Sequence, residues 1–193
     1  MKLKTTDLLT LEEYDLKRDS IKKELTDHKR NRTISIGENI ILIFEDFLTI
    51  KFQVQEMLRI EKIFNHNEIQ NEIDAYNPLI PNGTNFKATM LIMYPDVEER
   101  KEMLFKLHDI ENNIWISINN RKIIAIADED LERSTDDKTS AVHFLRFQLD
   151  QNNIADFLSG DDIRIGVSHP AYTDEVLLEK NVISSLAKDL KAN

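Results

Sequence analysis

The first part of the chain alternates apolar and charged positions with the period of a helix. Residues 10–13, Thr-Leu-Glu-Glu, form a capping-box pattern, in which a hydroxyl and a carboxylate three residues later accept from free backbone N–H groups. The apolar stripe Leu11, Tyr14, Ile21 and Leu25 keeps helical spacing. The pattern therefore predicts an N-terminal helix over residues 10–29.

The body of the chain, residues 33–169, has mostly the two-residue period of strands. Two short segments flank Gly37, which adopts the positive φ of a tight hairpin without a steric penalty. Two more flank Asn119-Asn120, a pair that tolerates the positive φ angles of a type I′ turn. Strands are predicted at residues 33–36, 39–44, 86–94, 114–118, 122–127, 141–149 and 163–168.

Shorter helical segments lie between these strands. Helices are predicted at residues 53–64, 66–76, 96–108 and 154–158, with one acidic helical turn at 128–133 and a C-terminal helix at 174–190. Residues 47–52 fit a strand and a helix equally well. Helices interspersed with hairpins favour a single α+β domain over residues 1–193, with a mainly antiparallel sheet and helices packed against it. A doubly wound α/β fold is the alternative, because residues 86–118 have a βαβ pattern.

The composition is that of a folded, water-soluble protein of cytoplasmic type. The 193 residues are 41% hydrophobic and 31% charged. No apolar run approaches the roughly 20 residues that a membrane span needs, and no signal-peptide pattern is visible. The net charge of −10 argues against general nucleic-acid binding. The basic residues of the tract 29–32 are interpreted as cations at a helix C-terminus, with a phosphate-binding arm as the alternative.

Several kinds of site are excluded by the residue types present. The chain has no cysteine, which removes disulfides, thiolate nucleophiles and iron–sulfur ligation. Its four glycines form neither a dinucleotide fingerprint nor a P-loop, so no nucleotide cofactor is expected. No Glu-x-x-His pair of the di-iron helical bundles occurs. A metal site, an acid–base site or simple ligand binding remain.

The segment 53–61, Gln-Val-Gln-Glu-Met-Leu-Arg-Ile-Glu, places polar residues among apolar ones. On a helix, Arg59 lies four residues after Gln55 and three after Glu56, so the three side chains are neighbours. Apolar residues occupy most of the circumference, and a buried charge must be paired. Two interpretations stay open, namely an internal ion pair that fixes the helix against the sheet, or one wall of a polar pocket.

The segment 139–147, Thr-Ser-Ala-Val-His-Phe-Leu-Arg-Phe, contains a predicted strand that is apolar on both faces. Each face carries one polar residue. His143 lies on one face and is either a hydrogen-bonded core residue or, among the histidines of this chain, the best candidate for a metal ligand. Arg146 lies on the other face and needs an acceptor, for which Asp128 and Glu56 are the candidates.

Several blocks of the chain, taken in order, resemble a known family. The blocks are residues 44–46, 53–61, 74–81 (Asp-Ala-Tyr-Asn-Pro-Leu-Ile-Pro), 94–100 (Tyr-Pro-Asp-Val-Glu-Glu-Arg), 125–133, 138–147 and 169–172 (His-Pro-Ala-Tyr). Together they look like a bacterial domain-of-unknown-function family, numbered thirty-five-oh-one, over nearly the whole chain. This resemblance transfers no activity. It implies genes neighbouring those of rubrerythrin and an iron–sulfur oxidoreductase, and hence a link to peroxide or iron redox metabolism.

Two main hypotheses follow. The first is a non-catalytic accessory or ligand-binding protein of a redox system, whose partner is a rubrerythrin-type or iron–sulfur protein. Such a protein could also form a homo-oligomer. A third hypothesis, a purely structural partner protein, is hard to distinguish from the first by sequence. The second is a metal-dependent or acid–base enzyme whose pocket uses Glu56, Arg59, His143 and Arg146. Convergence of these side chains on one pocket that solvent reaches would favour the enzyme.

Overall fold

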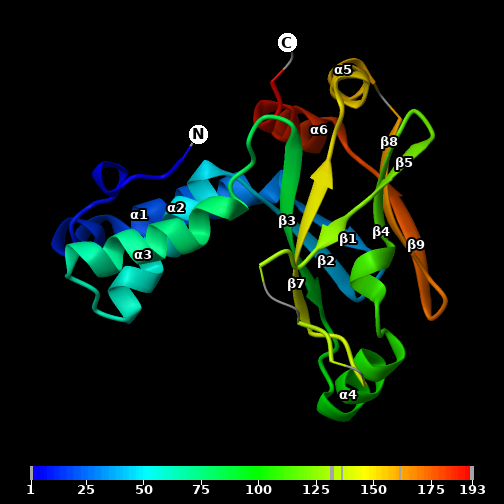
Figure 1. Cartoon of the computed structure of the whole chain (residues 1–193), viewed down its shortest axis with the longest axis horizontal. Helices are drawn as coiled ribbons and strands as arrows, with labels where there is room; N and C mark the ends of the chain where they lie inside the picture. Colours follow the sequence, from blue (N-terminus) through cyan, green and yellow to red (C-terminus); the bar gives the residue numbers. More distant parts are fainter. Residues whose placement is uncertain (1, 131–132, 136, 161, 192–193) are drawn as a thin grey trace.

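The computed structural model of the chain (Figure 1) describes residues 2–130, 133–135, 137–160 and 162–191. The α-helices are α1 Leu11–Arg30, α2 Phe47–Ile60, α3 His66–Tyr76, α4 Val97–Lys106, α5 Gln151–Ser159 and α6 Lys180–Leu186. The strands are β1 Thr33–Ile36, β2 Ile40–Glu45, β3 Asn85–Ile92, β4 Ile114–Ile118, β5 Arg121–Ile124, β6 Ile126–Ala127, β7 Val142–Gln148, β8 Ile163–His169 and β9 Tyr172–Leu177. Short 3₁₀ turns are η1 Thr5–Asp7, η2 Asn77–Leu79, η3 Ile110–Asn113 and η4 Ala187–Asp189.

The strands form two sheets, ordered β1-β2-β3-β7-β6 and β5-β4-β8-β9. Every pairing between these strands is antiparallel. The predicted α+β class with an antiparallel sheet is confirmed, although the strands are divided between two sheets. The hairpin between β4 and β5 turns at Asn119 and Asn120, whose φ angles of 50° and 64° are those of the predicted type I′ turn.

The main apolar core lies between the two sheets, because both contribute their inward-facing residues to one cluster. In β3, Phe86, Ala88 and Met90 are buried in this core, whereas Lys87 and Thr89 point to the other face of the five-stranded sheet. This alternation leaves the outer face of that sheet free to carry polar side chains.

A second, smaller apolar cluster joins the helices α1, α2 and α3. Figure 1 shows these three helices packed together on one side of the two sheets. The middle helix, α2, begins after Asp46, whose side chain accepts from the N–H of Thr49. Because α2 contacts α1, α3 and β2, apolar residues occur on several of its faces, which explains the unclear period of residues 47–52. No helix within the described residues is long and apolar enough to cross a membrane.

Three sequence-based assignments are wrong. The single strand predicted over 122–127 is divided at Ala125 into β5 and β6, which belong to different sheets. The predicted C-terminal helix over 174–190 begins only at Lys180, because residues 172–177 pair with β8 as the edge strand β9. An edge strand with three exposed polar residues in succession lacks the alternation that would reveal it. The predicted helical turn at 128–133 is also wrong in its described part, since Asp128 has a φ of 48° and residues 129–130 form a bend. Residues 131–132 lie outside the described residues.

Candidate functional site

The polar residues singled out from the sequence lie in three separate places. Gln55, Glu56 and Arg59 belong to the contact between α1 and α2, and Asp128 and His143 belong to a buried cluster beside η3. Arg146 lies on the outer face of the five-stranded sheet. Within the described residues these groups share no common pocket, so the enzyme site that combines them is not formed.

Glu56 is the centre of a closed ion-pair network between α1 and α2. Its carboxylate accepts from the hydroxyl of Tyr14 at 2.7 Å and from Arg18 at 2.7 and 2.8 Å, while Arg59 adds contacts at 3.3 and 3.4 Å. The hydrogen bonds from Arg18 lower the pKa of Glu56 to about 2. Gln55 binds both the N–H and the carbonyl of Leu9. This group fixes α1 against α2.

His143 lies in the interior with no exposed surface. Its Nδ1 is 2.5 Å from Asp128 Oδ2, and its Nε2 faces Thr139, whose hydroxyl donates to Glu111. The interpretation of His143 as a hydrogen-bonded core residue agrees with this burial and these contacts. The predicted pairing of Arg146 with Asp128 or Glu56 is wrong, because Asp128 pairs with His143 and Arg146 pairs with Glu129. Glu111 was not foreseen, because it lies on η3, more than thirty residues before His143 in the sequence.

Arg146 belongs to a charged row that crosses the outer face of the five-stranded sheet. Glu45 of β2 is opposite Lys87 of β3, and Lys87 is opposite Arg146 of β7. Residues that are opposite each other in neighbouring strands point to the same face. Arg146 is held by Glu129, with two contacts of 2.6 Å, and by the amide oxygen of Gln148 at 2.7 Å.

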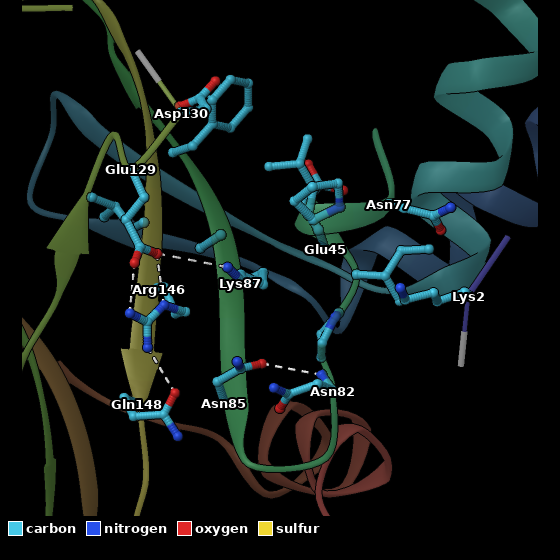
Figure 2. Close-up of a pocket in the computed structure, with 17 residues that line it drawn as sticks. Lys2, Glu45, Asn77, Asn82, Asn85, Lys87, Glu129, Asp130, Arg146 and Gln148 are labelled. Atoms are coloured by element: carbon cyan, nitrogen blue, oxygen red, sulfur yellow. Dashed lines mark hydrogen bonds and ion pairs between the residues drawn. The ribbon is translucent and has the colours of Figure 1, made fainter. Parts of the chain in front are cut away.

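This row is the floor of a cleft of about 740 Å³ (Figure 2). The segment from Asn77 to Asn82, which leads from α3 to β3, forms one wall, and Glu129 and Asp130 form the other. Phe144 also lines the cleft. The first wall is largely apolar, because it contains Pro78, Leu79, Ile80 and Pro81. The cleft thus combines an apolar body with polar groups at its floor, as small-molecule sites commonly do.

The carboxylates at the floor of the cleft are already occupied. Both oxygens of Glu45 accept hydrogen bonds, from Gln53 at 3.0 Å and from Thr89 at 2.7 Å. Both oxygens of Glu129 accept from the guanidinium of Arg146. These bonds lower the pKa of Glu129, since they stabilise its ionised form. Arg146 therefore balances the charge of Glu129, whereas the two hydrogen-bond donors to Glu45 are neutral groups.

The two asparagine amides of the cleft have their oxygens occupied and their nitrogens free. Oδ1 of Asn85 accepts from the backbone N–H of Asn82 at 3.2 Å, and Oδ1 of Asn82 accepts from the backbone N–H of Thr84 at 3.0 Å. A backbone N–H only donates, so these bonds also fix which amide atom is oxygen. Neither amide nitrogen donates a hydrogen bond to any other residue that the structure describes.

The ammonium of Lys87 is also incompletely satisfied. Its Nζ lies 3.9 Å from Glu129 Oε2, which is too long for a hydrogen bond, and it donates to none of the described residues. Only 16% of the side chain is exposed, and this burial lowers the pKa of Lys87. Lys87 therefore presents a partly desolvated positive charge to the cleft.

Lys87, Asn82 and Asn85 were not foreseen from the sequence. Lys87 reads as an ordinary outward-facing polar position of an alternating strand, and Asn82 precedes a glycine in what reads as a turn. The sequence does not show that the segment 77–82 covers the strand on which Lys87 lies. Only Arg146 among the cleft residues was a predicted site residue.

A family model described as a protein of unknown function, DUF3501, matches residues 2–190 of the chain. The chain belongs to this family. The DUF3501 chain is also similar to a crystal structure of a novel protein of unknown function from Burkholderia pseudomallei K96243, with a TM-score of 0.93 and 44% sequence identity. The similarity covers 99% of this chain and 100% of that one. A comparison with curated proteins gives no match.

Proposed function

We propose that this DUF3501 protein binds a small organic anion in the cleft on the outer face of its five-stranded sheet. One observation carries the proposal: the carboxylates of Glu45 and Glu129 already accept hydrogen bonds, whereas Nζ of Lys87 and the amide nitrogens of Asn82 and Asn85 donate to none of the described residues. Such a surface complements a carboxylate or a phosphate and not a cation. The charge-assisted bond to Lys87 would be the strongest single contact.

The apolar wall indicates the rest of the ligand. Pro78, Leu79, Ile80 and Pro81 follow one another along the chain and line the cleft, and Phe144 also lines it. A ligand with an apolar body and one anionic group would bury its body against these residues and place its charge at Lys87. Each buried methylene group contributes roughly 0.8 kcal/mol. A carboxylic acid with a short hydrocarbon body is the simplest molecule of this kind.

Thermal unfolding in the presence of hexanoate and of hexylamine tests the proposal. The two probes have similar apolar bodies and opposite charges, so binding at Lys87 is expected to raise the unfolding temperature with hexanoate alone. Inorganic phosphate, added separately, tests whether an anion without an apolar body suffices. Equal stabilisation by hexylamine, or none by any anion, would overturn the proposal.

Two lysine variants show whether the binding is local to the cleft. Lys87→Met is expected to abolish the effect of hexanoate, because it removes the charge and keeps the length of the side chain. Lys101→Met is the matched control, since Lys101 is an exposed residue of α4 paired with Glu98. Retention of the hexanoate effect in Lys87→Met would place the anion elsewhere.

The family resemblance supports a further proposal, that the protein is a non-catalytic accessory of a peroxide- or iron-handling redox system. A rubrerythrin-type or iron–sulfur protein is then its partner. Affinity purification of the tagged full-length chain from a bacterium that encodes both proteins is expected to recover that partner. Repeated purification without any such protein would remove this proposal and leave the anion site untouched.

A further inference from the structure

Four nitrogen and oxygen atoms come together where η3, the loop before β7 and β7 itself meet. Nε2 of His143 lies 2.8 Å from Thr139 Oγ1, 3.0 Å from the carbonyl oxygen of Ser140 and 3.8 Å from Glu111 Oε2. Thr139 Oγ1 is 2.9 Å from the same Glu111 oxygen. Ligands that share one divalent ion at about 2.1 Å stand roughly 3–4 Å apart. The four atoms therefore have the spacing of a coordination shell.

The hydrogen bonds of His143 add an independent indication of a cation. Asp128 Oδ2 lies 2.5 Å from Nδ1, and since a carboxylate only accepts, Nδ1 carries a proton. In the neutral ring, Nε2 is then an acceptor, and it faces the Ser140 carbonyl, which is an acceptor as well. Two lone pairs at 3.0 Å repel each other unless a positive charge lies between them. A metal ion or a second ring proton supplies that charge, and without either the hydroxyl of Thr139, 2.8 Å away, is the donor within reach of Nε2.

Asp128 lies beside the ring nitrogen of His143 that would not bind the metal, which is where a metal-binding histidine commonly has a supporting carboxylate. Such histidines commonly donate their second N–H to a carboxylate, which fixes the ring and strengthens the ligand. Asp128 is itself held in position, because its Oδ1 accepts from the N–H of Phe144 at 2.9 Å and pairs with Arg133 at 3.2 Å. The imidazole is therefore oriented before any ion arrives.

The cluster is buried, yet an ion has a path to it. His143 has no exposed surface, and Thr139 and Glu111 are 2% and 5% exposed. Glu111 and Asp128 also line a pocket of about 370 Å³ that lies between η3 and the segment around Ser134. Water in this pocket can complete the shell of an ion bound to Glu111.

We propose that Glu111, Thr139, the carbonyl of Ser140 and His143 bind one divalent ion of the Mn²⁺ or Fe²⁺ type, with Asp128 holding the imidazole. The donor set is three oxygens and one imidazole, which suits these ions, whereas structural Zn²⁺ sites use mainly thiolates and imidazoles in four-coordinate shells. The site is separate from the anion-binding cleft and its existence does not depend on the function proposed there.

Titration of the chelator-treated, full-length protein with Mn²⁺ tests the proposal, with free Mn²⁺ measured by electron paramagnetic resonance. We expect one ion per chain and a nitrogen coupling from one imidazole in the pulsed spectrum of the bound ion. Glu111→Gln removes a charged ligand of the same size, and Asp128→Asn removes the charge that supports the ring. Each is expected to weaken Mn²⁺ binding about tenfold or more.

Asp109→Asn is the matched control, because Asp109 is an exposed carboxylate on the rim of the same pocket. Its Mn²⁺ affinity is expected to equal that of the wild-type protein. Circular dichroism of each variant verifies folding, and the size-conserving variants avoid the cavity that His143→Ala would create. The proposal is overturned if the wild type binds no stoichiometric Mn²⁺, which assigns the charge to a second ring proton. Equal losses in Asp109→Asn and Glu111→Gln, or a missing nitrogen coupling, overturn it too.

Discussion

Two shielded cations lie close to the five-stranded sheet, and their surroundings differ. Arg32, just before β1, is 1% exposed and donates to the carbonyls of Phe44 at 3.0 Å and Glu45 at 3.1 Å, and it pairs with Asp189. Among the residues that the structure describes, Lys87 in the cleft has only the carboxylate of Glu129 as a charged partner, at 3.9 Å. A cation that stabilises the fold is surrounded by acceptors, whereas Lys87 keeps its donors available. By this difference, Arg32 is a cation that stabilises the fold, and Lys87 is a cation that is available to a ligand.

Removal of Arg32 is expected to have the largest effect on stability. Arg32→Met leaves the buried carboxylate of Asp189 without its partner, and breaking a buried pair costs about 3–5 kcal/mol. Urea unfolding measures this loss. Arg30→Met, which removes an exposed arginine paired with Asp27, is the control and is expected to change the free energy of unfolding by less than about 0.5 kcal/mol. A loss below about 1 kcal/mol for Arg32→Met would contradict the structural role.

Glu56→Gln tests a second charged group that neighbouring side chains hold in place, the carboxylate of Glu56 between α1 and α2. The variant removes the negative charge that Tyr14, Arg18 and Arg59 share, and hydrogen bonds to charged groups contribute about 1.5–3 kcal/mol. We expect a destabilisation of about 2 kcal/mol in urea unfolding. Glu98→Gln, on exposed α4, is the control and is expected to have almost no effect. Equal stability of the two variants would show that the Glu56 network does not hold α1 to α2.

The pH dependence of stability is expected to separate Glu56 from Asp189. The pKa of Glu56 is lowered from 4.5 to about 2, so its stabilisation is complete above about pH 4.5 and is lost as the pH falls toward 2. Burial raises the pKa of Asp189 from 3.8 to about 6, so its contribution favours folding below about pH 4 and decreases as the pH rises to 6.

Unfolding free energies between pH 2 and 7 for the wild type, Glu56→Gln and Asp189→Asn measure these slopes. Relative to the wild type, Glu56→Gln is expected to lose about 1–3 kcal/mol less on acidification below pH 4.5. Asp189→Asn is expected to lack the decrease between pH 4 and 6. If the free energy of unfolding changed with pH in the same way in all three proteins, the roles assigned to Glu56 and to Asp189 would both be ruled out.

Lys87→Met is expected to have the smallest effect on stability, and of the opposite sign. Burial lowers the pKa of Lys87, which means that the ionised side chain costs folding free energy at neutral pH. The variant is therefore expected to be as stable as the wild type or up to about 1 kcal/mol more stable. A loss above about 1 kcal/mol in urea unfolding would make Lys87 a structural cation like Arg32.

Periodicity revealed most of the strands and helices of this fold, because inward-facing positions repeat at fixed steps in β2, β3 and β7. It failed for β9, which has no fully buried residue. For α2 it predicted a helix from residue 53 but left the first turns, residues 47–52, undecided, because this helix is covered on several sides. Local patterns identify an element when one of its faces is buried and the other is not.

The site residues were harder to predict, because their partners come from distant parts of the chain. The polar insertions His143 and Arg146 were recognised from a single strand, but their partners Glu111 and Glu129 depend on how η3 and the loop after β6 fold back. The basic tract 29–32 looked uniformly solvated, yet Arg32 alone is buried. Burial of a charge is decided by tertiary packing, which a sequence window does not contain.

The acceptors of Arg32 have a consequence for the order of events during protein synthesis. Its partners Ser185 and Asp189 follow it by 153 and 157 residues, so they are synthesised long after β1 and β2. Until then Asp46, 3.6 Å from the guanidinium, is the carboxylate that pairs with Arg32, and the closer contact with Asp189 is missing. The environment of a residue just before β1 is therefore completed only when a segment more than 150 residues later in the chain has folded against it.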